Sequence, residues 1–392
     1  MRYLPPAYSP VSAGSLVGGL KGLALGLPAG VDQWLARRYD VDAALLLDSG
    51  TSALRLAIGS LVTEPSLRAR VALPAYGCYD LATAAIGARA DVSFYDLDPV
   101  TLGPDWDSFG AVLSAGVDAV VLVHQYGVPV DLDRACLLAE AHGTLVIEDA
   151  AQGAGAWWRN RRLGARGDLG VLSFGRGKGM TAGGGGALLA RGSRGNQLLE
   201  QARARVATGK RGTGSLARLV AQALLSHPML YGVPARMPWL ALGDTPFHDP
   251  WPPRRIDAAQ SGVLESAAAL ADIEAGTRRT LAVRLAAALI GARGVRLIEA
   301  PVGEGTLPGW LRFPALLEGV ERAKAGGAPF RQLGIMPGYP RPLPELPQLS
   351  GMRAAHASWP GAALLAEGIV TLPTHHWVAA ADMDAAVALL HA

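Results

Sequence analysis

Six short apolar runs in the first half of the chain constrain its fold more than any other feature of the sequence. Runs this apolar are typical of strands that are buried on both faces of a mostly parallel sheet. Between several of them lie helical patterns, over residues 52–60, 80–87 and 132–142. The alternation predicts an α/β domain in which helices connect successive strands and cover the sheet. The six runs are ALLLDSG, RVALPAY, DVSFYDLD, DAVVLVHQYG, TLVIEDAAQ and LGVLSFG.

The pattern changes after about residue 211. An apolar insertion over residues 214–243 leads into the proline-rich joint DTPFHDPWPPRR, and an alanine-rich helical stretch over 256–291 follows. Shorter strand-like and helical pieces alternate beyond it. We therefore predict two domains. Residues 1–249 form an N-terminal segment and a large domain that carries the insertion, and residues 250–392 form a small α+β domain.

Composition and charge exclude several classes of function. The net charge is only +3 on 392 residues, and the sequence has no run of basic residues, so we expect no nucleic-acid partner. Polar residues and prolines, such as Arg218 and Pro228, interrupt the insertion too early for a transmembrane segment. A buried or partner-facing helix is the favoured interpretation, and peripheral membrane contact is the alternative. No cysteine or histidine spacing is typical of a metal site, so we expect none.

The N-terminus lacks the charged-then-apolar pattern of a signal peptide. The two cysteines, Cys78 and Cys136, are too few for a disulfide framework. Both observations predict a cytoplasmic location.

Polar or glycine residues stand where five of the predicted strands end. The carboxyl ends of parallel strands meet at one edge of an open α/β sheet, where such sheets bind ligands. We therefore expect these residues to build a single site. They are Ser49, Gly50 and Thr51 after the first run, Tyr76 after the second, His124 after the fourth, Asp149 after the fifth and Ser173 after the sixth.

Two of these positions allow more than one interpretation. The segment DSGTSAL predicts a helix N-terminus, where N–H groups and the hydroxyls of Thr51 and Ser52 can hold a phosphate or simply cap the helix. Asp149 follows apolar strand residues, where an unpaired carboxylate is costly. A protonated pyridine nitrogen would serve as its partner, and so would the N-terminus of the next helix. Gln152 follows one turn later, where its amide could bind the same ligand.

A single lysine stands in the glycine-rich segment SFGRGKGMTAGGGG. The chain has only four lysines among its 36 basic Lys and Arg residues, and Lys178 is one of them. A desolvated lysine loses its proton more readily and becomes a nucleophile toward carbonyls, which arginine cannot do. The segment therefore suits a Schiff-base lysine beside a phosphorylated aldehyde cofactor. A surface-loop lysine is the alternative, whereas the spacing of a Walker phosphate loop is absent.

In order along nearly the whole chain, these segments resemble the DegT/StrS-type sugar aminotransferases, a branch of the fold-type-I pyridoxal-phosphate (PLP) enzymes. The resemblance implies a large domain with a mostly parallel seven-stranded sheet sandwiched by helices, and a smaller C-terminal α+β domain. It also implies PLP or its pyridoxamine form as cofactor, and a homodimer. The segments that carry it are DSGTSALRLAI, DVSFYDLDPVTLGPD, VVLVHQYGVPVDLD, HGTLVIEDAAQGAGA, GDLGVLSFGRGKGMTAGGGGAL, RRIDAAQSGVL, LGIMPGYPRPL and GIVTLPTHH.

The resemblance assigns roles to individual residues. Lys178 forms the Schiff base and moves the substrate proton, and Asp149 pairs with the pyridinium nitrogen. The family's usual stacking aromatic aligns with Cys78, so Tyr76 or Tyr79 is expected to stack on the cofactor instead. Cofactor contacts are further expected from Gly50, Thr51, Ser52, Gln152 and Ser173, and substrate contacts from His124, Arg176, Tyr339 and His375.

The implied activity is transfer of an amino group from an amino acid, most plausibly L-glutamate, to a nucleotide-linked keto-sugar in polysaccharide or antibiotic biosynthesis. A lyase of the aldol type on the same fold, or a PLP-binding regulatory or assembly protein, are the alternatives. A dehydratase relative is disfavoured because that branch replaces the lysine. The chain departs from the family at TAGGGG, which lacks a glutamate, at PPRR, which lacks an asparagine, and at Pro344, where a histidine is common.

Overall fold

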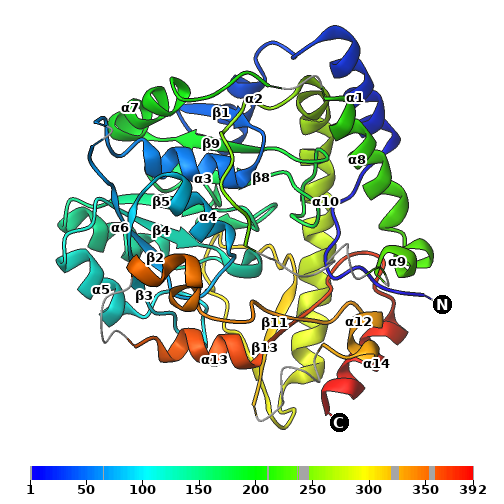
Figure 1. Ribbon diagram of the computed structural model, residues 1–392. Coiled ribbons are helices and arrows are strands. Elements are labelled where there is room, and N and C mark those ends of the chain that lie inside the picture. The colour runs from blue at the N-terminus through cyan, green and yellow to red at the C-terminus, as the bar shows by residue number, and fades with distance from the viewer. Residues whose placement is uncertain are drawn as a thin grey trace.

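A computed structural model describes residues 2–64, 66–209, 212–235, 237, 247–318, 326–352 and 358–391. Within these residues a seven-stranded sheet forms the centre of the molecule (Figure 1), with the strand order β1-β9-β8-β5-β4-β2-β3. Strand β9 runs antiparallel to both of its neighbours, and the other pairs are parallel. The strands are β1 (Ala43–Leu47), β2 (Arg70–Pro74), β3 (Asp91–Tyr95), β4 (Ala119–Val123), β5 (Leu145–Asp149), β8 (Leu169–Ser173) and β9 (Gly186–Ala190).

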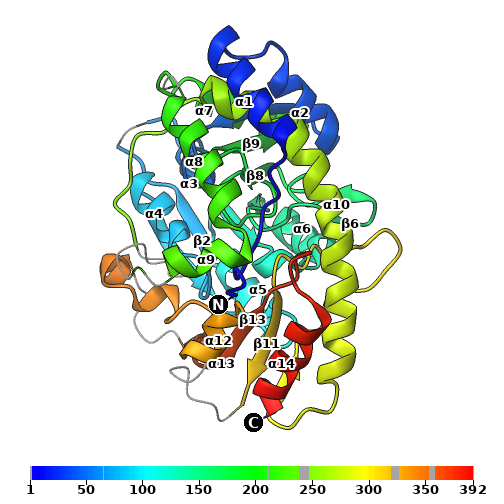
Figure 2. The same ribbon diagram turned by 90° about the vertical axis from the view of Figure 1, so that its right-hand side faces the viewer.

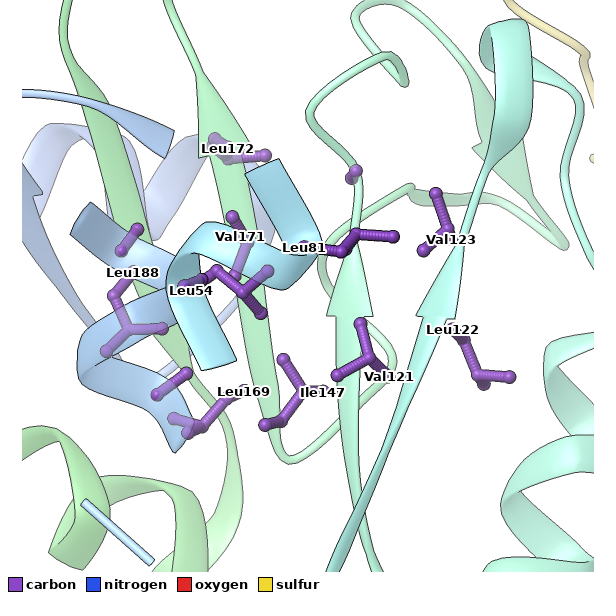
Figure 3. Packing of buried hydrophobic residues seen from close by; sticks show 14 of the residues in the cluster. Leu54, Leu81, Val121, Leu122, Val123, Ile147, Leu169, Val171, Leu172 and Leu188 are labelled. Atoms are coloured by element: carbon purple, nitrogen blue, oxygen red, sulfur yellow. The ribbon is translucent and has the colours of Figure 1, made fainter. Parts of the chain in front are cut away.

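The helical patterns between the apolar runs form the layers that cover this sheet. Leu54 of α3 and Leu81 of α4 pack against Ile147 of β5 and Val171 of β8 (Figure 3). Every residue of β4 and β5 is buried, which explains why these strands are apolar along their whole length. The helices of this part are α2 (Val31–Tyr39), α3 (Gly50–Gly59), α4 (Asp80–Gly87), α5 (Trp106–Ser114), α6 (Leu132–Ala141) and α7 (Gly192–Arg203), and the short turn Gln125–Gly127 follows β4.

A second, antiparallel sheet lies below the first in Figure 1, with the order β10-β11-β13-β12. It has its own apolar cluster, which includes Phe313, Ile335 and Leu372. Its elements are β10 (Val295–Leu297), β11 (Phe313–Leu317), α12 (Ala328–Gln332), β12 (Met336–Pro337), the turns Leu343–Glu345 and Pro347–Met352, α13 (Pro360–Gly368), β13 (Ile369–Leu372) and α14 (Ala380–His391). A hairpin of β6 (Trp157–Trp158) and β7 (Arg161–Arg162) stands apart from both sheets.

One long helix, α10 (Ala258–Leu289), connects the two sheets. Asp257 and Gln260 close its N-terminus in a reciprocal capping box, which fixes where the predicted alanine-rich helix begins. Val263 in its first half belongs to the larger core, and Leu285 in its second half belongs to the smaller one. Because one helix serves both cores, the domain boundary between residues 249 and 250 stays a prediction.

The N-terminal segment and the insertion pack along α10 (Figure 2). Helix α1 (Ala13–Leu25) approaches α10 through glycines: a Cβ on Gly18 would lie 2.3 Å from the carbonyl oxygen of Gly262. Helix α8 (Thr213–Leu225) contacts both α1 and α10, and α9 (Pro228–Ala235) follows it. Residues 236 and 238–243 of the predicted insertion lie outside the described residues. No helix of the described chain is long and apolar enough to cross a membrane.

Candidate active site

The carboxyl ends of the parallel strands enclose one pocket together with the first turns of α3 and α4. Asp149 comes from β5, Ser173 from β8 and Lys178 from the glycine-rich loop after β8. Of the residues at the predicted strand ends, Gly50, Thr51, Asp149 and Ser173 line this pocket. The others do not line it: Ser49, Tyr76 and His124. The lining residues are Gly50, Thr51, Leu54, Cys78, Asp80, Leu81, Val123, Asp149, Ala151, Gln152, Val171, Ser173 and Lys178.

Gly50 at the start of α3 packs directly against Ser173. A Cβ at position 50 would lie 2.9 Å from the Cβ of Ser173, so the close approach requires glycine. Ser49 caps α3, because its hydroxyl oxygen accepts the N–H of Ser52 at 3.0 Å. The hydroxyl oxygens of Ser49 and Ser52 are also 3.0 Å apart. Ser52 is therefore part of the helix cap, and it does not line the pocket. The hydroxyls of Thr51 and Ser173 line the pocket and have no hydrogen-bond partner among the described residues.

The carboxylate of Asp149 is buried and incompletely hydrogen-bonded. Its Oδ1 accepts the N–H of Ala151 at 2.9 Å, and Oδ2 has no donor among the described residues. Burial raises the pKa of Asp149, although the Ala151 N–H and the charge of Lys178 act in the opposite direction. A carboxylate in this position gains stability from any ligand that brings an N–H or a positive charge to Oδ2.

Gln152 connects this pocket to an adjoining compartment. Its Oε1 accepts the backbone N–H of Tyr126 at 3.0 Å, and its Nε2 donates to the hydroxyl of Tyr339 at 3.1 Å. The amide is therefore held in one orientation. Lys178 and Gln152 line both spaces, and Arg176 and Tyr339 line the adjoining one.

Neither tyrosine that was expected to stack on a ligand lines the pocket. Tyr76 is fully buried, and its hydroxyl oxygen accepts the N–H of Tyr339 at 2.8 Å. Tyr79 also turns toward Tyr339, with ring centroids 6.3 Å apart. Cys78, between them in the sequence, lines the pocket in their place. Burial and the nearby charge of Asp80 raise the pKa of the Cys78 thiol to about 12, so the thiol is protonated at neutral pH.

His124 is engaged in the fold rather than in the pocket. It is fully buried; its Nε2 lies 2.9 Å from Oε1 of Glu148, and its Nδ1 accepts the N–H of Val130 at 3.2 Å. Nδ1 therefore carries no proton, and Nε2–H donates to the carboxylate. Burial acts to raise the pKa of Glu148, but hydrogen bonds from His124 and from the backbone N–H groups of Gly164 and Arg166 lower it overall.

His375 lies away from both spaces that contain Lys178. Its Nε2 donates to the carbonyl oxygen of Pro5 at 2.7 Å, and the ring is almost completely buried. Burial lowers the pKa of His375 to about 4, although the Pro5 carbonyl acts to raise it. The structure thus places His375 as an anchor for the N-terminal segment and not in the expected substrate contact.

Three residues in or beside the pocket were not predicted from the sequence. Arg278 of α10 is 1% exposed and donates to the carbonyl oxygens of Ala154 at 2.6 Å and Gly309 at 2.9 Å, which fixes the loop after Gln152. Arg312 lines the compartment beside Lys178. Leu81 of α4 forms part of the apolar wall. The only signal for Arg312 was a charged residue at the start of the apolar run WLRFPAL.

The family is established by comparison. Residues 31–238 match the model of the DegT/DnrJ/EryC1/StrS aminotransferase family, which is more than half of the chain. The protein belongs to this family, and the resemblance drawn from its segments is confirmed.

Three similar proteins illustrate the relationship. L-glutamine:2-deoxy-scyllo-inosose aminotransferase of Streptoalloteichus tenebrarius is 36% identical over 36% of this chain and 33% of its own length. The dTDP-3-amino-3,4,6-trideoxy-alpha-D-glucose transaminase of Streptomyces venezuelae is 28% identical over 88% and 81%. The E. coli GDP-4-keto-6-deoxy-D-mannose-3-dehydratase structure with bound hydrated PLP superposes with a TM-score of 0.77, at 16% identity, over all of both chains. The last match confirms the expected fold.

The matches span about a third of the length of two curated relatives, 34% of Protein MosB of Rhizobium meliloti and 33% of the Streptoalloteichus tenebrarius enzyme.

The buried His375 predicts a pH dependence of stability. The pKa of an unfolded histidine is about 6.5, so below that pH the unfolded chain binds a proton that the folded chain binds only near pH 4. The free energy of unfolding is therefore expected to fall by up to about 1.4 kcal/mol per pH unit as pH decreases from about 6.5 to about 4, and to be unaffected by this group above that window. Urea unfolding at a series of pH values measures the slope.

His375→Gln keeps an N–H donor for Pro5 but cannot titrate, so its slope in this window should be smaller. His391→Gln, at an exposed position in α14, is the control and should retain the slope of the unaltered protein. Identical slopes in His375→Gln and the unaltered protein would contradict the assignment.

Proposed function

We propose that the protein is a PLP-dependent aminotransferase that moves an amino group from an amino acid to a keto-sugar. The observation that carries this proposal is the shared pocket of Lys178 and the buried carboxylate of Asp149. An amine beside a buried acid, with a helix N-terminus at the other end, suits a cofactor that has an aldehyde, a ring nitrogen and a phosphate.

The residues of the pocket fit this cofactor. The free Oδ2 of Asp149 supplies an acceptor for a protonated ring nitrogen. The first turn of α3, with the unpartnered hydroxyls of Thr51 and Ser173 beside Gly50, supplies the phosphate end. Apolar side chains also line the pocket, among them Leu54 and Val171, and would exclude water from a bound ring. When bound, PLP supplies an aldehyde that exchanges amines and a ring that accepts electrons.

Three side chains of the pocket would hold the cofactor, move the proton and orient the ring. Nζ of Lys178 would hold the cofactor covalently and, once released, carry the proton that leaves the α-carbon of the amino donor. The Asp149 carboxylate would keep the ring nitrogen protonated, since a positive partner offsets the cost of its burial. Gln152 would orient the ring, because both ends of its amide are fixed by Tyr126 and Tyr339.

The pocket wall beside the ring would be formed by Cys78. Its protonated thiol is a small, polarizable group that can lie against a flat ring. We assign Tyr76 and Tyr79 to support of Tyr339 and not to stacking.

The reactants are inferred from relatives. L-glutamate is the expected donor, and the acceptor is expected to be a nucleotide-linked keto-sugar. Two relatives support this class of acceptor: dTDP-3-amino-3,4,6-trideoxy-alpha-D-glucose transaminase and UDP-N-acetyl-3-dehydro-alpha-D-glucosamine 3-aminotransferase. Biosynthesis of a polysaccharide or an antibiotic sugar is the expected setting. A cytoplasmic location is part of the proposal, because both cysteines are free thiols.

We also propose that the enzyme is a homodimer. Helices α1, α8 and α9 expose large apolar side chains on neighbouring surfaces, which supports a covered face. The more exposed of them are Val17, Leu20 and Leu25 of α1 and Leu224, Met229 and Val233 of α8 and α9.

Substitution in this apolar face should weaken the dimer. Leu224 is 58% exposed on α8, and Leu224→Glu would bury a charge if a second copy covers it. We expect sedimentation velocity to give a dimer for the unaltered protein and a shift toward monomer for Leu224→Glu. Leu137→Glu, at a 68% exposed site on α6, should leave the dimer intact. A monomer at every concentration would reject the dimer.

Lys178→Ala is expected to lose the covalent link to PLP. After incubation with PLP and reduction with borohydride, mass spectrometry should find one added cofactor on the unaltered protein and on Lys21→Ala, an exposed lysine of α1 that serves as the control. Lys178→Ala should carry none. The absorption of the loaded, unaltered protein should also change when L-glutamate is added. An adduct on another lysine would remove Lys178 from its role.

Asp149→Asn is expected to fold and bind PLP, because the amide oxygen can still accept the Ala151 N–H. Turnover should fall by about 100-fold or more, since the asparagine cannot hold a proton on the ring nitrogen. Single-turnover kinetics with L-glutamate measures the loss. Asp91→Asn, at an exposed site, is the control. Undiminished turnover in Asp149→Asn would argue for a different acid.

A further inference from the structure

Asp80 is a second carboxylate in the pocket of Lys178 and Asp149, and the proposed reaction gives it no role. It is the first residue of α4, it is partly buried, and it lines the same pocket as those two residues. The part of the chain that the structure describes offers its side chain no hydrogen bond and no ion pair. Among the described lining residues, two carboxylates and one amine therefore share this space.

The fold fixes the start of α4, and with it the backbone of Asp80. The N–H of Leu81, the next residue, donates to the carbonyl oxygen of Cys78 at 3.0 Å. The side chain of Leu81 packs in the larger core beside the strands (Figure 3). The hydroxyl of Thr83 donates to the carbonyl oxygen of His248 at 2.8 Å, which ties the same helix to the chain after the insertion. Asp80 is therefore held at the pocket wall.

The negative charge of Asp80 acts on two other side chains of the pocket. Burial raises the pKa of the Cys78 thiol to about 12, and the charge of Asp80 is the next largest cause. Burial is also the largest cause of the raised pKa of Asp149, and the charge of Asp80 adds to it. The charge of Lys178 acts in the opposite direction on both groups. Asp80 and Lys178 thus act on the same neighbours with opposite sign, and a carboxylate so placed favours a positive charge on the lysine nitrogen.

The other charged groups around Lys178 do not replace Asp80 in this effect. Asp149 is assigned to the ring nitrogen, which stands opposite the ring carbon that bears the aldehyde. Two arginines line the adjoining compartment but not the pocket of Asp80, and their charges disfavour a positive charge on Lys178. Besides Lys178 and Asp80, the titratable groups that line the two spaces among the described residues are Cys78, Tyr126, Asp149, Arg176, Arg312 and Tyr339.

We propose that the negative charge of Asp80 holds the proton on the nitrogen of Lys178 while that nitrogen is joined to the aldehyde carbon of the cofactor. This inference rests on the proposed Schiff-base role of Lys178. The nitrogen of such a C=N link is positive only when it is protonated, and an opposite charge nearby favours the charged form. The carbon of a protonated link attracts the amine of a donor more strongly than that of a neutral link. Asp80 thereby extends the reactive form of the loaded enzyme to higher pH.

A pH titration of the absorption of the PLP-loaded protein tests this role. The protonated and the neutral link absorb at different wavelengths, so the titration gives the pKa of the link. Asp80→Asn should lower that pKa by about one pH unit, because it removes the negative charge beside a cation. Asp80→Ser removes the same charge and should give the same result. Asp80→Glu keeps the charge and should retain most of the unaltered value.

Asp107→Asn is the matched control. Asp107 is exposed and also stands in the first turn of a helix, α5, so its substitution removes the same charge from a helix N-terminus outside the pocket. A carboxylate that only stabilises its helix would change the melting temperature and leave the pKa of the link unaltered. Asp107→Asn should therefore titrate as the unaltered protein does. In Asp80→Asn, the alkaline limit of the glutamate-dependent spectral change should fall by the same amount as the pKa of the link.

The role of Asp80 is overturned if Asp80→Asn and Asp80→Ser titrate as Asp107→Asn does. It is also overturned if both neutral variants fail to retain the cofactor, since Asp80 would then serve binding and not the proton. The two proposals fail separately. A link to Lys178 that forms and titrates identically in every variant rejects the role of Asp80 alone, whereas absence of that link in the unaltered protein rejects the Schiff-base role.

Discussion

The carboxylate of Asp149 is buried at the carboxyl end of β5, where water cannot offset its charge and the described chain gives it one hydrogen bond. A folded protein tolerates such a group only if a ligand or a nearby cation compensates it. The surrounding geometry serves this requirement, because Lys178 lies within electrostatic reach and Gly50 lets α3 approach Ser173 closely. The pocket is therefore best understood as a space built around the buried carboxylate of Asp149 and the amine of Lys178, with a helix N-terminus at its far end.

Glu148, the residue before Asp149 in β5, is a buried carboxylate with a structural role. Adjacent residues of a strand point to opposite faces, so Glu148 and Asp149 enter different environments. Glu148 accepts hydrogen bonds from His124 and from the backbone N–H groups of Gly164, Arg166 and Gly167, and its pKa is lowered. Asp149 has a raised pKa and an oxygen without a donor. Both acids are buried in the central strand of the sheet, and the difference in hydrogen bonding separates the acid that holds the fold from the acid that we propose binds the cofactor.

The sequence predicted the parallel sheet, the long helix and the pocket residues that belong to local patterns. Gly50 and Asp149 stand at the ends of apolar runs, so the strand-end rule located them without knowledge of tertiary contacts. Lys178 was located by the glycine-rich segment around it. Tyr76, which the same rule selected, turns away because its hydroxyl accepts a hydrogen bond from the backbone of Tyr339, 263 residues later. His375, which the resemblance placed at the substrate, has the carbonyl oxygen of Pro5 as its partner, 370 residues earlier in the chain. Contacts between distant parts of a chain leave no period or spacing in the sequence, and they decide the direction of these side chains.

The proposed Schiff-base role explains why this chain, which uses arginine almost everywhere, places a lysine at 178, two residues after Arg176. Arginine keeps its charge under all conditions in a protein and presents a planar fork, so it can bind an anion but cannot act as a nucleophile. Lysine can lose its proton in a desolvated pocket and then attack a carbonyl carbon. Gly177 between them has a φ of 71°, a conformation that favours glycine, and a Cβ there would lie 3.6 Å from the Cβ of Ala7. The sharp turn lets Lys178 line the pocket that contains Asp149, while Arg176 lines a cavity bordered by the N-terminal segment and helices α8 and α9.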